Sequence, residues 1–342
     1  MAEFVLYRKY RPKSFNDVLG QDHIVKTLSG AIRNNRLSHA YLFAGPRGTG
    51  KTSIARILAS ELKTSNKDLY ELDAASNGGI DEIREVCDGA RTLPFDSAKK
   101  VYIIDEVHML SRGAFNALLK TLEEPPVHAI FILATTELHK VPDTVVSRCQ
   151  IFNFKKPSHQ ILREMVKVVS KKEGYKTDDD AADLMALLGD GSFRDTHGIL
   201  QKIISTSSSK NLVLKDVEDI TGAPQSAIIR GVIKSILDRN LPEAIALLRQ
   251  SSKDNVDSRI FIKMLIHHLR LVLLIKFAPE LENEILDEFS ADGALFFKEC
   301  GNHKNVVAMP TVLRELLFAY EETRSAYIGE LPLELTLIRL LT

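Results

Sequence analysis

The chain has 342 residues, of which 44% are hydrophobic and 26% charged, so it is not disordered throughout and has enough material for two or three domains with real cores. Its 45 basic and 45 acidic residues cancel, so a nucleic-acid contact would have to come from a local patch. The sequence has no run of about eighteen apolar residues, so we expect neither a membrane span nor a signal peptide. The widely spaced Cys87, Cys149 and Cys300 predict a reduced, cytoplasmic protein.

The first segment, residues 7–13, is basic and contains two tyrosines and one proline. Two interpretations stay open: a solvated arm, or a segment that folds over the flat ring of a ligand. Apolar residues at helical spacing from 24 to 32 then predict a helix, with Asp22 as its cap.

Residues 45–52 fit the pattern G-x-x-x-x-G-K-[ST], between a predicted buried strand at 40–44 and a predicted helix at 53–59. The glycines let backbone N–H groups turn toward phosphate oxygens, and the following helix brings its positive end to the same anion. Lys51 would place its ammonium between the outer phosphates, and Thr52 would offer its hydroxyl to Mg²⁺. The order of strand, loop and helix therefore predicts a nucleotide-phosphate site. Its expected contacts are Gly45, Pro46, Arg47, Gly48, Thr49, Gly50, Lys51, Thr52 and Ser53.

Two acidic residues follow a second decisive strand. The four apolar residues 101–104 predict a strand buried on both faces of a parallel sheet, and Asp105 and Glu106 come directly after it. Ligands of such sheets bind at the carboxyl ends of the strands. Asp105 would hold Mg²⁺, and Glu106 would orient and polarise an attacking water.

A third apolar run, 129–134, predicts another buried strand and ends at Thr135 and Thr136. A hydroxyl there would reach a γ-phosphate or its water, while an ordinary strand-end turn stays open as the alternative. The remaining expectations for this half are a strand at 69–72, a helix at 80–90 capped by Ser76 or Asn77, and a helix at 115–123 capped by Ser111.

Beyond residue 156 strand patterns largely vanish and helices dominate. We interpret the apolar stripes of these helices as bundle core. His267 and His268 are interpreted as core or surface histidines rather than metal ligands. The expected helices cover 161–169 with Ser158 as cap, 177–188 with Thr177 as cap, a segment opening at 193, 215–221, 228–237, 242–249, 258–277, 281–298 and 311–327.

These segments resemble the bacterial DNA polymerase III gamma/tau family, the ATPase subunits of the clamp loader. The resemblance is carried by YRKYRPKSFNDVLGQDHIVKTL, HAYLFAGPRGTGKTSIAR, YELDAASNGGIDEIR, VYIIDEVHMLSRGAFNALLKTLEEPP, ILATTELHKVPDTVVSRC and GSFRDT. It implies an α/β fold, with an AAA+ P-loop NTPase core on a parallel sheet over residues 1–156. A small helical lid over 157–222 and an all-α collar for oligomerisation over 223–342 would follow.

The resemblance also implies a role for individual polar residues. The implied assignments are Lys51 and Thr52 as Walker A contacts, Asp105 and Glu106 as the Walker B pair, Thr136 as sensor 1, Arg148 as the arginine finger and Arg194 as sensor 2. The finger would reach the ATP of a neighbouring subunit, and sensor 2 would contact the γ-phosphate from the lid. A guanidinium suits both roles because it is always charged. Adenine would be flanked by Arg11, Pro12, Val18 and Leu19.

The function implied by the resemblance is ATP-dependent loading of a sliding clamp onto primed DNA during replication, in the cytoplasm. The implied partners are the clamp, the DNA and other clamp-loader subunits, namely delta, delta-prime and further gamma/tau copies. The expected DNA contacts are Ser76, Asn77, Gly78, Arg84 and Lys120. They suit phosphate tracking without base reading, and for the two cations ordinary exposed charge stays open.

Two departures from the family pattern matter. Many gamma/tau subunits carry a four-cysteine zinc module between the first helix and the second strand, but residues 61–68 contain no cysteine and are too few, so we expect no zinc. The chain also ends after the collar, which suits a gamma-like form, a truncated chain or a lineage with short subunits.

Three alternative functions stay in view. A non-hydrolysing scaffold subunit resembling delta-prime would be expected to have a damaged phosphate loop. Another AAA+ DNA-processing motor, such as a branch-migration motor, would be expected to end in a winged DNA-binding domain. A small-molecule kinase would not need Arg148 or Arg194.

Overall fold

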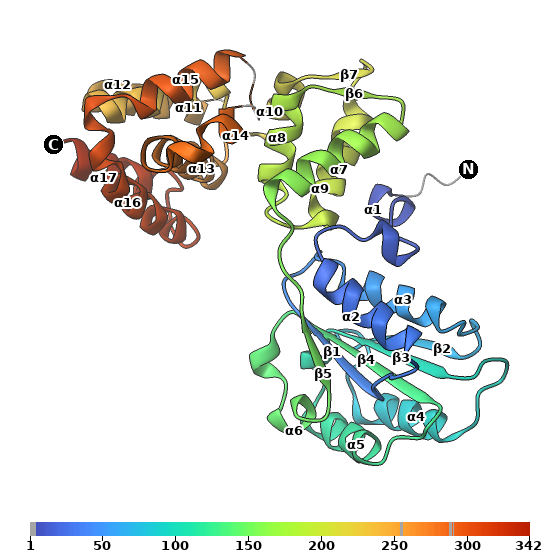
Figure 1. Ribbon diagram of the computed structural model, residues 1–342. Coiled ribbons are helices and arrows are strands. Elements are labelled where there is room, and N and C mark those ends of the chain that lie inside the picture. Colours follow the sequence, from blue (N-terminus) through green and yellow to red (C-terminus); the bar gives the residue numbers. More distant parts are fainter. Residues whose placement is uncertain (1–4, 254–255, 287–288, 290) are drawn as a thin grey trace. The chain divides into compact units, whose positions relative to one another are not determined.

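The computed structural model of the chain describes residues 5–253, 256–286, 289 and 291–342. The chain forms two compact units (Figure 1). Unit 1 contains Met1–Leu162 and Gly189–Gly198, and unit 2 contains Arg163–Leu188 and Ile199–Thr342. The predicted domain boundaries after residues 156 and 222 stay predictions.

Unit 1 is built around a five-stranded parallel sheet with the strand order β2-β3-β4-β1-β5 (Figure 1). The strands are β1 (Ala40–Ala44), β2 (Leu69–Asp73), β3 (Lys100–Asp105), β4 (Ala129–Thr135) and β5 (Gln150–Asn153). The first four confirm the predicted strands. The fifth was not predicted, because only Phe152 of this edge strand is buried and its sequence therefore has no apolar pattern.

Helices cover both faces of this sheet: α2 (Asp22–Arg33) and α3 (Lys51–Glu61) on one, α4 (Ile80–Arg91) and α5 (Arg112–Glu123) on the other. One core contains Ile24, Leu28, Ile54 and Ile57 with Tyr41, Phe43, Val101, Ile103, Ile130 and Ile132. The second core contains Ile83, Cys87, Phe115 and Leu118 with Leu42, Tyr102, Ile104, Phe131 and Leu133. Because alternate side chains enter opposite cores, the central strands are apolar along their length, which made them predictable.

The carboxyl ends of the parallel strands lie at one edge of the sheet. The register pairs Ala44 of β1 with Thr135 of β4, and Asp73 of β2 with Asp105 of β3. The loop 45–50 leaves β1 at this edge. The fold therefore brings the predicted phosphate loop, the acidic pair and the threonines to the same side of the sheet.

Helix starts in unit 1 agree only partly with the predictions. Asp22 is the first residue of α2, and Gln21 holds the cap position. Ser111 caps α5 as predicted, because its hydroxyl accepts a hydrogen bond from Ala114 N at 3.2 Å. Short elements complete the unit: α1 (Leu6–Lys9), α6 (Asp143–Val146) and the 3₁₀ turns η1 (Phe15–Asp17), η2 (Val107–Met109) and η3 (Leu138–Lys140).

The described part of unit 2 is mainly helical, with one short parallel pair, β6 (Lys176–Thr177) and β7 (Asn211–Leu212). Thr177 therefore lies in a strand and does not cap a helix. Two helices begin in unit 1 and continue into unit 2, namely α7 (His159–Lys172) and α9 (Phe193–Thr206). The others are α8 (Asp179–Leu188), α10 (Leu214–Thr221), α11 (Ser226–Asp238), α12 (Leu241–Lys253), α13 (Ser258–Phe277), α14 (Glu282–Leu286), α15 (Ala291–Gly301), α16 (Met309–Glu322) and α17 (Leu331–Leu341).

The single helix predicted over 281–298 is wrong. The chain forms the 3₁₀ turn η4 (Pro279–Leu281) and then two separate helices, α14 and α15. Positions 287, 288 and 290 of the predicted helix lie outside the described residues. Helix α17 was not predicted, although it buries Leu333 and Leu337.

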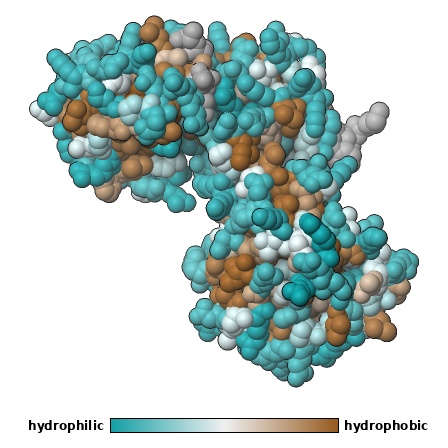
Figure 2. All heavy atoms as spheres, viewed as in Figure 1, coloured by the Kyte–Doolittle hydropathy of each residue, from teal (hydrophilic) through white to brown (hydrophobic). Residues whose placement is uncertain are grey.

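Hydrophilic side chains cover most of the visible surface of each unit, and hydrophobic ones form separate patches (Figure 2). Exposed large hydrophobic residues of α16, α17 and the segment between them are Leu317, Phe318, Tyr327, Ile328, Leu331, Leu335 and Ile338. Within the described residues, no helix is long and apolar enough to cross a membrane.

Candidate functional site

The phosphate-binding loop adopts a backbone that requires glycine. Gly48 and Gly50 have φ values of +73° and +102°, in the left-handed region. A Cβ added at Gly48 would lie 1.9 Å from Ser192 Oγ, whereas one at Gly50 would meet nothing within 4 Å. The loop thus packs tightly on one side and leaves open space at the start of α3, where an anion would meet the helix N-terminus.

Lys51 is buried with 6% of its surface exposed, and its ammonium lies under the loop. Its Nζ donates to the carbonyl oxygens of Gly45 at 2.7 Å and Pro46 at 2.9 Å. Burial lowers the pKa of Lys51, while the nearby Glu106 and Asp105 carboxylates oppose that change. The loop therefore holds a cation at its centre.

Thr52 and Asp105 meet across the edge of the sheet. Thr52 Oγ1 donates to Asp105 Oδ2 at 2.7 Å, and the other carboxylate oxygen of Asp105 accepts from Glu106 N at 3.0 Å. A hydroxyl and a carboxylate are the hard oxygen ligands that Mg²⁺ takes in nucleotide sites. The donor set and the open space beside Gly50 therefore fit a nucleotide with its magnesium ion.

Glu106 occupies a strained position directly after β3. Its φ of +49° lies in the left-handed region, which a non-glycine residue seldom adopts. Its Oε2 accepts hydrogen bonds from Thr136 Oγ1 at 2.9 Å and Thr136 N at 3.3 Å. The structure thus brings the second predicted acidic residue to the predicted threonine of the neighbouring strand.

His108 joins this cluster, although it was not among the predicted site residues. Its Nδ1 lies 3.0 Å from Thr135 Oγ1 and 3.5 Å from Glu106 Oε2. The available signal was its position two residues after the acidic pair. That signal is weak because a short turn can point such a residue in any direction.

Arg11 of the N-terminal segment contacts the first turn of α3. Its Nε donates to Ser53 Oγ at 3.1 Å, and burial together with the nearby Arg56 lowers its pKa. Pro12 and Val18 are half-buried, and Leu19 is 47% exposed. The segment predicted to flank a base therefore lies beside the phosphate loop.

The start of α9 also packs on the loop. Phe193 N donates to Gly48 O at 3.0 Å, so the backbone of α9 meets the loop directly. The guanidinium of the next residue, Arg194, lies 5.1 Å from the centre of the Tyr7 ring, a cation–π distance. The predicted sensor 2 residue therefore directly follows the residue that contacts the loop, while its side chain packs on the Tyr7 ring.

Arg148 lies elsewhere in unit 1, after α6. Its NH1 donates to Thr144 O at 2.7 Å, and its NH2 pairs with Glu123 Oε1 at 2.7 Å. About a third of the side chain is exposed, 34%. A partly exposed guanidinium held by its own protomer is compatible with a contact to another subunit.

The predicted DNA contacts are at the surface of unit 1. Ser76, Asn77 and Lys120 are exposed, and Arg84 pairs with Asp81 at 3.1 Å along the helix. Helix α4 begins after Gly79, so the predicted caps Ser76 and Asn77 do not cap it. Gly78 O accepts a backbone hydrogen bond from Ser111 N at 3.1 Å.

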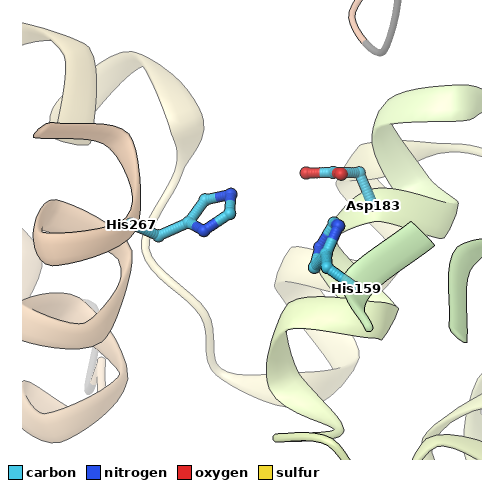
Figure 3. A group of neighbouring side chains, drawn as sticks. All are labelled: His159, Asp183 and His267. Carbon is cyan, nitrogen blue, oxygen red and sulfur yellow. The ribbon is translucent and has the colours of Figure 1, made fainter. Parts of the chain in front are cut away.

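The two histidines of α13 differ in environment. His268 is half-buried, and its Nδ1 lies 2.8 Å from Met264 O within the same helix. Figure 3 shows the imidazole of His267 projecting from α13, together with Asp183 of α8 and His159 of α7. Because His159 belongs to unit 1 and the other two residues belong to unit 2, we do not assign a metal site to these three side chains.

Two family models match the chain. The one described as DNA polymerase III, delta subunit, matches residues 20–77 and 63–158. The one described as DNA polymerase III subunits gamma and tau domain III matches residues 212–342. Together they cover most of unit 1 and the C-terminal helices.

Curated relatives agree with these matches. The chain is 42% identical over 313 residues to DNA polymerase III subunit tau of Bacillus subtilis (strain 168), which covers 85% of this chain and 55% of that protein. It is 38% identical over 281 residues to subunit gamma/tau of Mycoplasma pneumoniae, of which it spans 41%. It is 37% identical over 305 residues to subunit gamma of Buchnera aphidicola subsp. Schizaphis graminum, covering 82% of this chain and 83% of that protein. The chain thus spans about half the length of the first two proteins.

A solved structure supports the fold. The Holliday junction branch migration motor RuvB of Thermotoga maritima matches with a TM-score of 0.54 and 23% identity over 67% of this chain and 79% of that chain. That similarity bears on the fold alone, a core with a parallel sheet followed by helices. With the identity and coverage of the gamma relative, the chain belongs to the DNA polymerase III gamma/tau family.

Proposed function

We propose that this chain is an ATP-hydrolysing motor subunit of a clamp loader, which places a sliding clamp on primed DNA during replication. One observation carries the proposal. Lys51, the Thr52–Asp105 pair and the Glu106–Thr136 pair converge at one edge of the sheet, in a chain of the gamma/tau family. An intact set of this kind would be superfluous in a scaffold that does not hydrolyse nucleotide.

The binding half of the site is the loop and its magnesium ligands. Backbone N–H groups of residues 45–53 and the ammonium of Lys51 would bind the phosphates of ATP. Thr52 Oγ1 and Asp105 Oδ2 would hold Mg²⁺, which neutralises phosphate charge when bound. Arg11, Pro12, Val18 and Leu19 would flank the adenine.

The hydrolytic half is Glu106 with its partner Thr136. Glu106 Oε2 is the atom that would accept a hydrogen bond from the attacking water and polarise it. In this structure the same oxygen accepts two hydrogen bonds from Thr136. Thr136 would therefore hold the carboxylate of Glu106 in place while the other lone pairs of the carboxylate accept from the water.

Two arginines would complete the site. Arg194 would contact the γ-phosphate within the same subunit after leaving the Tyr7 ring. Arg148 would act in trans on the ATP of a neighbouring subunit, because its guanidinium lies on the surface of its own protomer. A finger supplied in trans makes hydrolysis depend on assembly.

The rest of the assembly follows the family resemblance. We propose delta, delta-prime and further gamma/tau copies as partner subunits, with helical regions 157–222 as lid and 223–342 as collar. The exposed apolar residues of α16 and α17 would contribute to the collar contacts. Ser76, Asn77, Gly78, Arg84 and Lys120 are the proposed DNA contacts, in a cytoplasmic complex that uses ATP and Mg²⁺ and no zinc.

The deciding experiment measures ATP hydrolysis by the chain with its partner subunits, with and without clamp and primed DNA. We expect the clamp and primed DNA together to raise the turnover. A turnover that ignores both would contradict clamp loading while leaving an ATPase of another kind. Absence of nucleotide binding would contradict the site itself.

A further inference from the structure

His197, a buried histidine of α9, has one ring nitrogen for which the described residues supply no partner. His197 is only 7% exposed, and its Nδ1 lies 2.6 Å from the carbonyl oxygen of Phe193. A carbonyl oxygen only accepts, so Nδ1 carries the proton and Nε2 is left as an acceptor. Among the described residues no group donates to Nε2, which is itself buried.

An orphaned acceptor in the interior is unfavourable, and native proteins seldom retain one without a reason. Burial lowers the pKa of His197, so the ring is neutral near pH 7 and Nε2 keeps its lone pair. The position therefore offers a water-shielded acceptor that lacks a donor within the described part of the chain.

His197 is close to the phosphate loop through its own helix. Phe193 N donates to Gly48 O at 3.0 Å, and Ser192 Oγ fills the space where a Cβ at Gly48 would lie. His197 comes four residues after Phe193, so its Cα lies roughly 6 Å further along the axis of α9. A nucleotide held by the loop would extend its sugar and base over a distance of this order.

The N-terminal segment also packs against His197. The rings of Tyr10 and His197 are nearly parallel, with an angle of 15° and centroids 6.5 Å apart. The next residue, Arg11, is tied to Ser53 at the start of α3 by the 3.1 Å hydrogen bond. A stacked pair of flat rings therefore lies in unit 1 next to a residue that contacts the start of α3, and such rings are suitable partners for a planar ligand.

We propose that His197 reads the base of the bound nucleotide, with Nε2 accepting a hydrogen bond from the exocyclic amine of adenine. The inference rests on the proposed ATP site and adds its base selectivity. Guanine and hypoxanthine carry an oxygen at the position of that amine, which would set a lone pair against a lone pair. His197 is thus a specificity-determining residue for adenine.

The test compares equilibrium dissociation constants by calorimetry for three triphosphates: ATP, purine riboside triphosphate without the amine, and 2′-deoxy-ATP without the ribose hydroxyl. They are measured on the full chain, on His197→Leu and on His268→Leu. The last is a matched control, since His268 is a half-buried histidine whose Nδ1 also faces a carbonyl four residues earlier, in α13 of unit 2.

We expect the unmodified chain and His268→Leu to bind purine riboside triphosphate about tenfold more weakly than ATP, the value of one hydrogen bond in a shielded site. In His197→Leu the two constants should become equal within about twofold. A merely structural role would weaken all three nucleotides together and leave their ratios unchanged, which would overturn the proposal.

Other outcomes separate the remaining explanations. If His197→Leu removes a preference for ATP over 2′-deoxy-ATP, the donor is the ribose hydroxyl and base reading is wrong. If His197→Leu does not fold, His197→Phe keeps the ring without its nitrogens and gives the same comparison. A chain that binds no triphosphate contradicts the proposed function, whereas ATP binding without discrimination contradicts only the base selectivity.

Discussion

Unit 1 and unit 2 use their buried polar groups in different ways. In unit 1, Lys51, Asp105 and Glu106 come from different segments and converge at one edge of the sheet. In unit 2, buried and half-buried polar groups serve local structure: His268 bonds within its own helix, and Glu218 accepts from Ser226 N at 2.8 Å. A catalytic site needs side chains from distant segments to meet at one place, whereas hydrogen bonds within or between adjacent helices are enough to stabilise those helices.

The difference predicts separable effects. Substitutions at the sheet edge of unit 1 should change binding or turnover and leave the free energy of unfolding nearly unchanged. Substitutions of buried polar groups in unit 2 should change the free energy of unfolding and leave binding and turnover nearly unchanged.

The largest expected effect follows from Lys51→Ala. Removing the ammonium takes away its charge-assisted contacts, so the affinity for ATP should fall at least about 1,000-fold. Calorimetric titration measures it. Lys202→Ala is the matched control, because that ammonium also donates to a backbone carbonyl, Ile220 O at 2.6 Å, but in unit 2. Affinity within a few-fold of the unmodified chain would remove Lys51 from the site.

Arg148→Ala should leave ATP affinity unchanged and lower the turnover of assembled subunits about 1,000-fold, since an arginine finger contributes on that scale. Mixing Arg148→Ala with Lys51→Ala subunits should restore part of the activity, because some interfaces then contain one intact finger and one intact loop. Mixed assemblies that are verified by mass spectrometry and remain inactive would argue against action in trans.

Glu106→Gln should bind ATP normally and hydrolyse it about 100-fold more slowly, because an amide cannot take up a proton from water. Single-turnover kinetics separates binding from hydrolysis. Glu137→Gln, which changes a nearby carboxylate paired with Lys140, should keep its turnover. Unchanged hydrolysis by Glu106→Gln would reassign the role of Glu106.

The smallest effect on activity is expected from His268→Leu in unit 2. Burial lowers the pKa of His268 to about 4, from an ordinary value of 6.5. The unfolded chain takes up this proton below pH 6.5, so the histidine lowers the free energy of unfolding by about 3 kcal/mol as pH falls from 6.5 to 4. His197 acts in the same direction, so the variant should reduce this acid sensitivity without abolishing it.

Denaturant unfolding at pH 7 and pH 4.5 measures that difference. ATP affinity of His268→Leu at pH 7 should equal that of the unmodified chain. A variant as acid-sensitive as the parent would show that His268 does not stay neutral in unit 2, and altered ATP affinity would break the separation of the two units.

The sequence was most informative where local pattern decides structure. The central strands and the loop at 45–52 were predictable because their apolar runs and glycines leave few other conformations. The break between α14 and α15, the edge strand β5 and the packing of Arg194 on Tyr7 depend on tertiary contacts that no local pattern encodes. The same holds for the hydrogen bonds of Glu106 with Thr136 and for the place of His108 beside them.

Gly48 has a mechanical consequence. The missing side chain lets the loop and the first turn of α9 share the Phe193–Gly48 hydrogen bond, with Ser192 filling the gap. A shift of the loop backbone would therefore pull on a helix that carries Arg194 and runs on to Thr206. A single methyl group added at residue 48 would collide with Ser192 and separate the loop from the first turn of α9. The proposed phosphate contacts of the loop would then no longer be coupled to the position of that helix.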